Sequence, residues 1–515
     1  MEKGRTKNTI RNIKSGVIYQ IVSIILPFIN RTAILYTLGT EFTGLSGLFT
    51  SILHVLNIAE LGFNSAIVYS LYQPVAENDI KRINEIVSLL KKVYNIIGWF
   101  ILVAGVLLMP AIPYLIKGTY PSSMNIYYLY LLYLINSVLS YFLFAYKESL
   151  LIANQRKDIA DNIRTIINVI RYLVQLIVLI IFRNFYIYLI VSVIGTISTN
   201  IIIHLNVSKR YKYLSNIKGK TKIPNSIKKQ VMGLMVGKIS DTCRNSFDSL
   251  IISSFLGLTA LTIYGNYYYI YSSLTSIMLV ICNSMSASVG NSVVERNEKD
   301  NFESLLTFSQ LFSIILCICT TCLVTLYQPF MIIWVGDSLL LPLSDMLLFC
   351  LYFYMVNINN IRNQFISGNG MWDKLKASYI LEAIANLILN ILLGKLFGIT
   401  GVIVATIITI FIFNYLQRNY ILFKNYFKSN SIILFYKEQL YYLLLTTISC
   451  VVSYLICNII DVTGIIGLLI YGLVSVTISI TIMTIGLIFT KRFSNTMNMV
   501  KRIIRVVTKR QRKEA

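Results

Sequence analysis

The chain has 515 residues, of which 56% are hydrophobic and 13% are charged, and its formal net charge is +24. So much apolar sequence excludes a water-soluble arrangement of domains and indicates a protein solvated by lipid. Clustered Lys and Arg can indicate nucleic-acid binding. Here the cations lie between apolar runs, so they indicate membrane topology and no nucleic-acid partner.

Crossing about 30 Å of hydrocarbon takes roughly 20 apolar residues, which predicts about fourteen transmembrane helices and an all-α polytopic membrane protein. The predicted spans are 15–37, 44–71, 92–116, 124–151, 163–182, 185–207, 229–256, 262–291, 304–327, 342–365, 376–396, 399–420, 439–460 and 465–489. No small-residue cleavage site follows the first apolar run, so the first helix is expected to remain as an anchor.

The connections between these spans predict the orientation. A cytoplasmic N-terminus places most Lys and Arg on the cytoplasmic side, as the positive-inside bias requires. Only Lys117, Arg183 and Lys395 would then lie at outer ends. We therefore expect both termini in the cytoplasm.

A weak internal repeat indicates two related halves. Leu38-Gly39 followed by Gly47-Leu48-Phe49 recurs as Leu256-Gly257 followed by Gly265-Asn266-Tyr267, each at the loop between the first two helices of a six-helix unit. Transporters built from repeats place the substrate between the halves. The predicted domains are a basic N-terminus (1–14), an N-lobe of helices 1–6 (15–207), a basic linker (208–228), a C-lobe of helices 7–12 (229–420), helices 13–14 (421–489) and a basic tail (490–515).

Ionisable residues within the predicted spans are candidate site residues, because a charge at lipid depth needs a protein-lined or hydrated environment. On the second helix, His54, Asn57, Glu60 and Asn64 belong to one polar stripe, which predicts a face toward a cavity. His54 taken alone would more often be a packing residue, and its place in the stripe makes a cavity position equally compatible.

The seventh and eleventh helices carry the remaining carboxylates. Arg244 lies between Asp241 and Asp248 at helical spacing, near Lys238, which is compatible with an internal salt-bridge set or with substrate contact. Glu382 could join helices through polar contacts or could carry a coupling proton. Glu60, Asp241, Asp248 and Glu382 are thus the candidate ion-coupling residues.

Arg31 and Arg171 lie within their helices and have no acidic residue three or four positions away. A guanidinium matches phosphate oxygens, so these side chains are candidates for binding an anionic ligand. Arg362 lies in an Asn-rich stretch at a predicted cytoplasmic helix end, which suits a cavity entrance. The eight cysteines lie inside apolar stretches and are expected to be small apolar fillers; no metal site, catalytic residue or cofactor is predicted.

Four long segments resemble a known family. They are LGTEFTGLSGLFTSILHVLNIAELGFNSAIVYSLYQPVAEND (38–79), SYFLFAYKESLLIANQRKDI (140–159), FDSLIISSFLGLTALTIYGNYYYI (247–270) and the 369–408 run that begins NGMWDKLKASYILEAIANLILN. They resemble the Gram-positive-type polysaccharide transporters, which are oligosaccharide flippases of the multidrug/oligosaccharidyl-lipid/polysaccharide (MOP) exporter superfamily.

The resemblance implies two six-helix lobes in a V shape that alternate access, plus two C-terminal helices. The implied activity is movement of a polyprenyl-pyrophosphate-linked repeat unit of O-antigen, capsule or exopolysaccharide to the outer leaflet of a bacterial cytoplasmic membrane. The implied coupling ion is H⁺ or Na⁺, and the implied partners are membrane lipids, a polysaccharide polymerase and assembly proteins. The cavity cations carried over are Arg31, Arg171 and Arg244, to which the intramembrane position adds Lys238 and Arg362.

Three other functions remain open on the sequence. A peptidoglycan-precursor flippase has the same helix number and a cationic cavity in its family, and an ion-coupled multidrug exporter shares the two-lobe plan. A membrane-embedded polymerase or glycosyltransferase is disfavoured, because the chain lacks a large outer loop, an acidic donor motif and a Gly-rich phosphate loop. We therefore expect a transporter and not an enzyme.

Overall fold

Each predicted span overlaps helix in the computed structural model. The structure describes residues 2–60, 63–118, 120–121, 124–213, 225–428, 431–460, 462–488, 490, 492–494 and 496–497. Within these ranges the elements are all helical, with no strand. The chain divides into two compact units, Met1–Gly265 and Asn266–Ala515. This division falls inside the helix Leu258–Ser284. The sequence suggests a different boundary, in the 208–228 linker.

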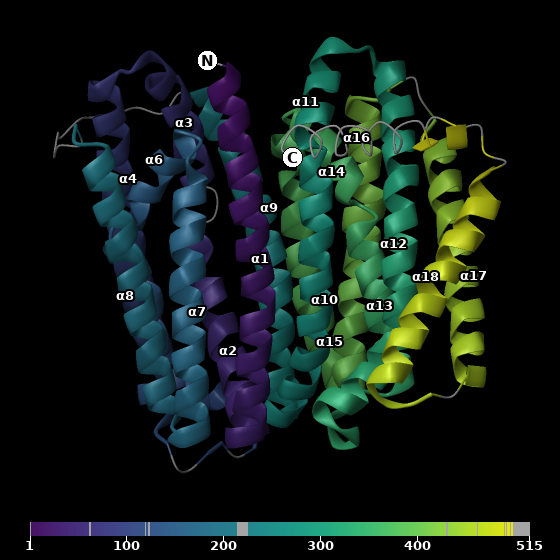
Figure 1. Cartoon of the computed structure of the whole chain (residues 1–515), viewed down its shortest axis with the longest axis horizontal. Coiled ribbons are helices and arrows are strands. Elements are labelled where there is room, and N and C mark those ends of the chain that lie inside the picture. Colours follow the sequence, from purple (N-terminus) through teal and green to yellow (C-terminus); the bar gives the residue numbers. More distant parts are fainter. Residues whose placement is uncertain are drawn as a thin grey trace, which may run out of the picture. The chain divides into compact units, whose positions relative to one another are not determined.

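Unit 1 is built from α1 to α9 and the start of α10 (Figure 1). Within it α1 packs along α7, α7 along α8, and α2 along α9. Its elements are α1 (Glu2–Leu38), α2 (Thr40–Leu56), the 3-10 turn η1 (Asn57–Glu60), α3 (Phe63–Glu77), α4 (Ile80–Leu108), η2 (Met109–Leu115), α5 (Ile126–Phe142), η3 (Ala145–Lys147), α6 (Glu148–Ala153), α7 (Lys157–Ile181), α8 (Phe185–Arg210), α9 (Asn225–Leu256) and α10 (Leu258–Ser284).

Unit 2 contains the rest of α10 and the elements up to α18. Here α12 packs against α17 and α18, and α13 packs against α15. Its elements are α11 (Ser286–Glu295), α12 (Glu298–Val335), η4 (Asp337–Leu339), α13 (Leu343–Asn357), α14 (Asn360–Gly368), η5 (Met371–Leu375), α15 (Lys376–Thr409), the π-helix η6 (Ile410–Gln417), α16 (Arg418–Asn425), α17 (Ile432–Ile460) and α18 (Gly464–Ile488).

The protein is a multi-pass membrane protein. Among the described residues, eight helices are long and apolar enough to span a membrane, or nine if the bent α5–α6 pair counts as one span. Several other predicted spans are broken, as at η1 and between α13 and α14, and α9 carries charged residues along its length. The predicted spans 376–396 and 399–420 fall within one helical stretch, Met371–Asn425, which counts once. The number is therefore smaller than the predicted fourteen.

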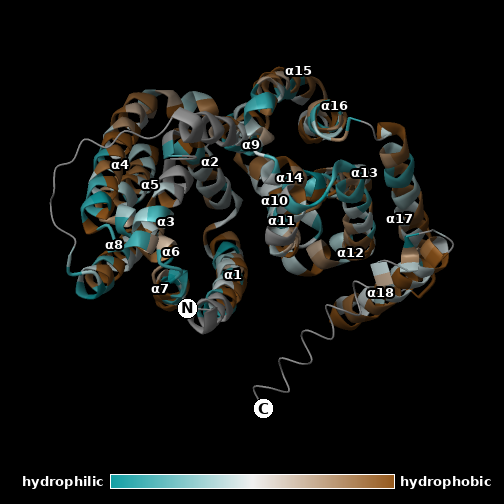
Figure 2. Cartoon of the chain, turned by 90° about the horizontal axis from the view of Figure 1, so that it is seen from above, coloured by the Kyte–Doolittle hydropathy of each residue, from teal (hydrophilic) through white to brown (hydrophobic). Residues whose placement is uncertain are grey.

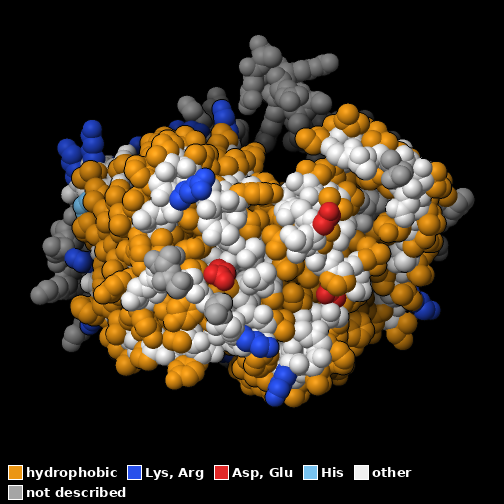
Figure 3. All heavy atoms as spheres, turned by 90° about the horizontal axis from the view of Figure 1, so that it is seen from below, with side chains coloured by type: hydrophobic (Ala, Val, Ile, Leu, Met, Phe, Trp, Pro, Cys, Tyr) orange, Lys and Arg blue, Asp and Glu red, His pale blue; other side chains and the backbone are white. Residues whose placement is uncertain are grey.

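The outer faces of the helices are apolar. On α7, Ile170, Val174, Ile177 and Ile181 are exposed on one side, as expected for contact with lipid. Figure 2 shows hydrophobic residues covering much of α17 and α18. Figure 3 shows the face opposite the N-terminal end, where hydrophobic and neutral side chains dominate and charged ones are scattered.

The sequence repeat recurs as a repeated backbone corner. Gly39 joins α1 to α2 at φ 99°, and Gly257 joins α9 to α10 at φ 93°. The Gly39 N–H donates to the carbonyls of Ile34 and Leu35, and the Gly257 N–H donates to those of Ile252 and Ser253. Positive φ at both positions explains why glycine occupies them.

The two corners also pack against each other inside unit 1. The Thr262 hydroxyl donates to the Thr40 carbonyl over 2.6 Å. At Gly44 an added Cβ would lie 2.4 Å from the Leu258 carbonyl oxygen. Gly44 therefore allows α2 to approach the first turn of α10 at backbone contact.

Gly44→Ala should lower the thermal unfolding midpoint, because the new methyl group cannot share space with the Leu258 carbonyl. The matched control is Gly47→Ala on the same helix, where the added Cβ would meet Leu261 at an ordinary 3.8 Å. Both changes gain up to about 1 kcal/mol of helix propensity, so only the contact differs. Equal midpoints for the two variants in detergent would contradict this packing.

Candidate functional site

A ladder of polar contacts joins the second predicted span to α5. The Tyr133 hydroxyl donates to Ser46 Oγ over 2.8 Å, and the Ser137 hydroxyl donates to Asn57 Oδ1 over 3.0 Å. At the end of the ladder, the Tyr141 hydroxyl donates to Glu60 Oε2 over 2.7 Å. The polar stripe is thus partly bonded to a neighbouring helix.

Glu60 has a second phenol partner. The Tyr94 hydroxyl of α4 donates to its Oε1 over 2.9 Å, so each carboxylate oxygen accepts one phenol hydrogen bond. No Lys or Arg of the described residues forms an ion pair with Glu60. In the 3-10 turn η1, side chains three positions apart eclipse, which places Asn57 and Glu60 on the same side, toward α5.

The other predicted members of the polar stripe differ from one another in exposure. His54 is exposed and Asn57 is half-buried. The side chain of Asn64 lies outside the described residues. The single helical face predicted from the sequence therefore ends where α2 passes into η1.

Arg31 reaches α10. Its Nη2 lies 3.4 Å from the Thr262 carbonyl oxygen, to which it donates, and the guanidinium occupies the space beside Gly265. The neighbouring Asn30 is buried and donates to the Tyr172 carbonyl of α7, which fixes the rotation of α1. The arginine is thus half-buried within unit 1.

The same turn of α10 approaches Asp248. This carboxylate is fully buried on α9, and the Tyr264 hydroxyl donates to it over 2.9 Å. One turn before Asp248 on α9, Arg244 is buried and pairs with Asp241 at 3.0 Å, which is the internal ion pair expected from their spacing. Lys238 is exposed. Arg31 and Asp248 therefore reach one turn of α10 from two different helices.

Arg171 lies on the buried face of α7. Its aliphatic stem packs across Gly195 of α8, and its guanidinium lies 4.4 Å from the centre of the Tyr172 ring. Its Nε is buried and lacks a hydrogen-bond partner, and no carboxylate of the described residues pairs with it. The side chain is held in place by packing while its charge is not neutralised by an ion pair.

Unit 2 encloses a different charged cluster. Glu382 of α15 is fully buried and forms an ion pair with Arg418, which is also buried. The guanidinium of Arg418 stacks at 3.8 Å on the ring of Tyr379. The contact places Glu382 in a buried pair between α15 and α16.

Arg362 belongs to the same unit and is only 1% exposed, so it does not line an open entrance in this structure. Its Nη2 donates to Asn414 Oδ1 over 2.6 Å and to Asn363 Oδ1 over 2.8 Å, and its Nη1 donates to the Asn414 carbonyl. Asn414 lies in the π-helix η6, a form common at functional sites. Neutral oxygens thus solvate this guanidinium.

Two kinds of functional neighbour were not identified from the sequence. Arg418 lies at the end of a predicted span, where a cation is usually assigned to the interface, and its pairing with Glu382 depends on the fold. The tyrosines that bind Glu60 and Asp248 lie on other helices or farther along the chain, so the sequence alone does not connect them to these carboxylates. Tyr133 and Tyr141 lie eight positions apart with Ser137 between them, and this polar spacing on α5 is a signal that could have indicated a face.

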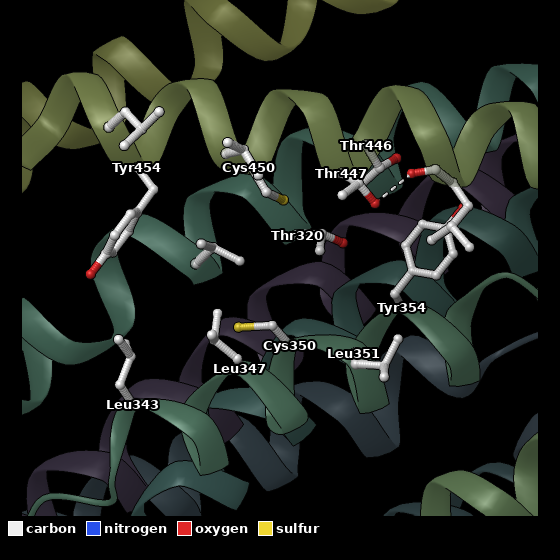
Figure 4. Close-up of a pocket in the computed structure, with 14 residues that line it drawn as sticks. Thr320, Leu343, Leu347, Cys350, Leu351, Tyr354, Thr446, Thr447, Cys450 and Tyr454 are labelled. Atoms are coloured by element: carbon white, nitrogen blue, oxygen red, sulfur yellow. Dashed lines mark hydrogen bonds between the residues drawn. The ribbon is translucent and has the colours of Figure 1, made fainter.

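An apolar cavity of about 390 Å³ lies in unit 2 between α12, α13 and α17. Figure 4 shows Leu347 and Cys350 of α13 opposite Cys450 and Tyr454 of α17. Its lining is mostly hydrocarbon and sulfur. A cavity of this composition suits an alkyl chain.

Glu382→Gln should destabilise the protein strongly, because it leaves the Arg418 guanidinium buried without a counter-charge, at a cost of about 3–5 kcal/mol. The measurement is denaturant or thermal unfolding in detergent.

The matched control is Asp373→Asn, which breaks the Lys376–Asp373 pair, whose side chains are 30% and 29% exposed. Partly exposed pairs contribute about 0–1 kcal/mol, so this variant should unfold almost like the unmodified protein. Similar losses in both variants would contradict the structural role of the buried pair.

The fold is similar to those of solved transporters. The structure titled "Lipid II flippase MurJ, inward closed conformation" has a TM-score of 0.64 and 18% identity, and covers 92% of this chain and 99% of its own. An inward-facing multidrug resistance MATE family transporter of the MOP superfamily has a TM-score of 0.57 and 13% identity, with coverage of 77% and 94%. A MOP superfamily transporter from Pyrococcus furiosus has a TM-score of 0.54 and 11% identity, with coverage of 82% and 97%.

No family model matches the sequence. No curated protein matches it either. At identities of 11–18%, the structural likeness describes the architecture and not the substrate. The chain therefore has the fold of the MOP superfamily transporters.

Proposed function

We propose that this protein is a flippase that moves a polyprenyl-pyrophosphate-linked oligosaccharide repeat unit of O-antigen, capsule or exopolysaccharide from the cytoplasmic to the outer leaflet by alternating access. The observation that carries the proposal is Arg171, a half-buried cation in a transporter fold that forms no ion pair with the described carboxylates. The solved structures with a similar fold are transporters, which supports a transport function over an enzymatic one.

Arg31 and Arg171 are the proposed pyrophosphate ligands. Both lie within predicted spans, both are half-buried, and both belong to unit 1. A planar guanidinium can bind two phosphate oxygens at once, which a lysine cannot do with the same geometry. Arg244 and Arg362 are less suited, since Arg244 pairs with Asp241 and Arg362 is enclosed by asparagine oxygens. Lys238 is exposed and remains available.

The second candidate is a flippase for a lipid-linked peptidoglycan precursor. The likeness to the lipid II flippase favours it, because that structure covers 92% of this chain. An ion-coupled multidrug exporter is the third, supported by the likeness to MATE family transporters. The unneutralised Arg171 favours an anionic substrate over a cationic drug.

The proposed setting is the cytoplasmic membrane of a bacterium, with both termini in the cytoplasm. The positive-inside bias of the sequence supports this orientation, because only Lys117, Arg183 and Lys395 would lie at outer ends. A polysaccharide polymerase and assembly proteins are the proposed partners, since they would receive the translocated unit.

Glu60 is the proposed coupling residue, with H⁺ as the ion. Of the four candidate carboxylates, Asp241 and Glu382 are held by arginines. Asp248 is fully buried, whereas Glu60 is only half-buried and has two phenol partners. A carboxylate held by neutral donors can gain a proton without breaking an ion pair.

Arg31→Gln and Arg171→Gln should each weaken binding of a polyprenyl-pyrophosphate by roughly 10- to 100-fold, the value of a lost hydrogen bond to a charged group. Binding is measured with purified protein in detergent, alongside the unfolding midpoint. Arg183→Gln, at an exposed turn, is the control and should bind normally. Unchanged affinity in both variants would refute the assignment.

Reconstituted vesicles should translocate a polyprenyl-pyrophosphate-linked repeat unit faster than the lipid-linked peptidoglycan precursor, and should not export cationic dyes. The rate is followed by the accessibility of the sugar at the outer leaflet. Faster movement of the peptidoglycan precursor would select the second candidate, and dye export without lipid movement would select the third.

Glu60→Gln should abolish the response of transport to an imposed proton gradient, because the amide keeps an acceptor for tyrosine but cannot take up a proton. Glu77→Gln, at the exposed end of α3, serves as the control and should retain the response. Transport by the unmodified protein that ignores proton and sodium gradients alike would remove ion coupling from the proposal.

A further inference from the structure

The bundle of unit 1 is interrupted between α5 and α6, where the two helices bend by 44°. Phe144 lies at the bend with φ 61° and ψ 10°, a left-handed conformation that bulky side chains rarely adopt. The short turn η3 follows and ends at Lys147. This conformation directs the turn toward α8.

Two contacts hold the turn against α8. The ring of Phe144 lies 3.9 Å from the ring of His204, measured between centroids, at an interplanar angle of 32°. One turn later on α8, the Ser208 hydroxyl accepts a 2.9 Å hydrogen bond from Lys147 Nζ. The ammonium also lies 5.9 Å from the centre of the Phe144 ring. Lys147 is therefore a positioned cation and not a freely extended one.

The positive charge of Lys147 is not neutralised. No carboxylate of the described residues pairs with it, and the adjacent Glu148 is engaged through both oxygens by Arg164. Lys91 of α4 adds a second positive charge that repels that of Lys147. The Nδ1 atom of His204 is buried without a hydrogen-bond partner. The cluster thus has surplus positive charge and an unsatisfied imidazole nitrogen.

The surroundings are those of a membrane interface. On α4, Ile96 and Trp99 are 59% and 60% exposed, and on α8 Leu205 is 58% exposed, as expected for lipid-facing positions. Lys91 and Lys92, before Ile96 on α4, are exposed, as are Lys209 and Arg210 at the C-terminal end of α8. Along both helices, exposed apolar side chains thus lie next to exposed cations. Acyl chains and head groups lie next to each other in the same way in a membrane leaflet.

We infer that Lys147 and Ser208, flanked by Lys91 and His204, form a binding site for the phosphodiester head group of an anionic membrane lipid. Lys147 has two N–H donors left after the bond to Ser208, and these suit the non-bridging oxygens of a phosphodiester. The exposed apolar side chains of α4 and α8 would contact the acyl chains, which a soluble phosphate lacks. The site lies in the cytoplasmic leaflet under the proposed orientation and is separate from the transport cations Arg31 and Arg171.

The test is native mass spectrometry of the full-length protein titrated with phosphatidylglycerol or phosphatidylcholine. Phosphatidylglycerol should bind more tightly. Lys147→Gln should weaken its binding about fivefold, the weight of one Lys charge at an anionic surface. Lys147→Arg should retain it, and Lys299→Gln, an exposed lysine at the start of α12, should leave it unchanged.

Lys91→Gln provides a second test, because this exposed side chain can be replaced without disturbing the turn. It should also weaken phosphatidylglycerol binding, by less than Lys147→Gln. Equal affinity of the unmodified protein for the two lipids, or a Lys147→Gln variant that binds like Lys299→Gln, would overturn the site. Displacement of the lipid by an equal concentration of inorganic pyrophosphate would overturn the lipid assignment in favour of a soluble phosphate.

Discussion

A charged group inside a membrane must be solvated by the protein that carries it, because hydrocarbon offers neither water nor counter-ions. This constraint shapes both units. Glu382 and Arg418 neutralise each other between α15 and α16. Arg362 is bound by the oxygens of Asn363 and Asn414, and the π-helix η6 carries the second of these residues. The helices around the cluster are therefore held together by buried charges whose separation costs about 3–5 kcal/mol.

In unit 1 the same constraint is met mainly by phenols. Tyr94 and Tyr141 bind the two oxygens of Glu60, and Tyr264 binds Asp248. The two phenols stabilise the Glu60 carboxylate without an ion pair to any Lys or Arg of the described residues, so its protonation would not break such a pair. The carboxylate of Glu382, bound by arginine, serves stability, whereas that of Glu60, bound by tyrosines, is the one compatible with the proposed proton coupling.

The repeated corners show how close packing and sequence constrain each other. Gly39 and Gly257 both need positive φ, and the corners that they form meet where Gly44 lacks a side chain. Arg31 reaches the same region through Thr262 and Gly265. A glycine pattern that first suggests only internal similarity thus marks the place where two helix pairs approach at backbone contact and leave room for a guanidinium.

The sequence by itself determined the helical membrane class, because apolar length is a local property that lipid enforces on each span. It also identified several buried ionisable residues, namely Arg244, Asp248, Arg362 and Glu382, since their position within apolar runs is visible in one dimension. Which of them pair was decided by the tertiary structure. The pair of Arg244 and Asp241 lies three positions apart on one helix, so the sequence could indicate it, whereas Arg418 and Glu382 are 36 positions apart and only the fold brings them together. Contacts between helices depend on rotation and breaks such as η1 and η6, which hydropathy does not encode.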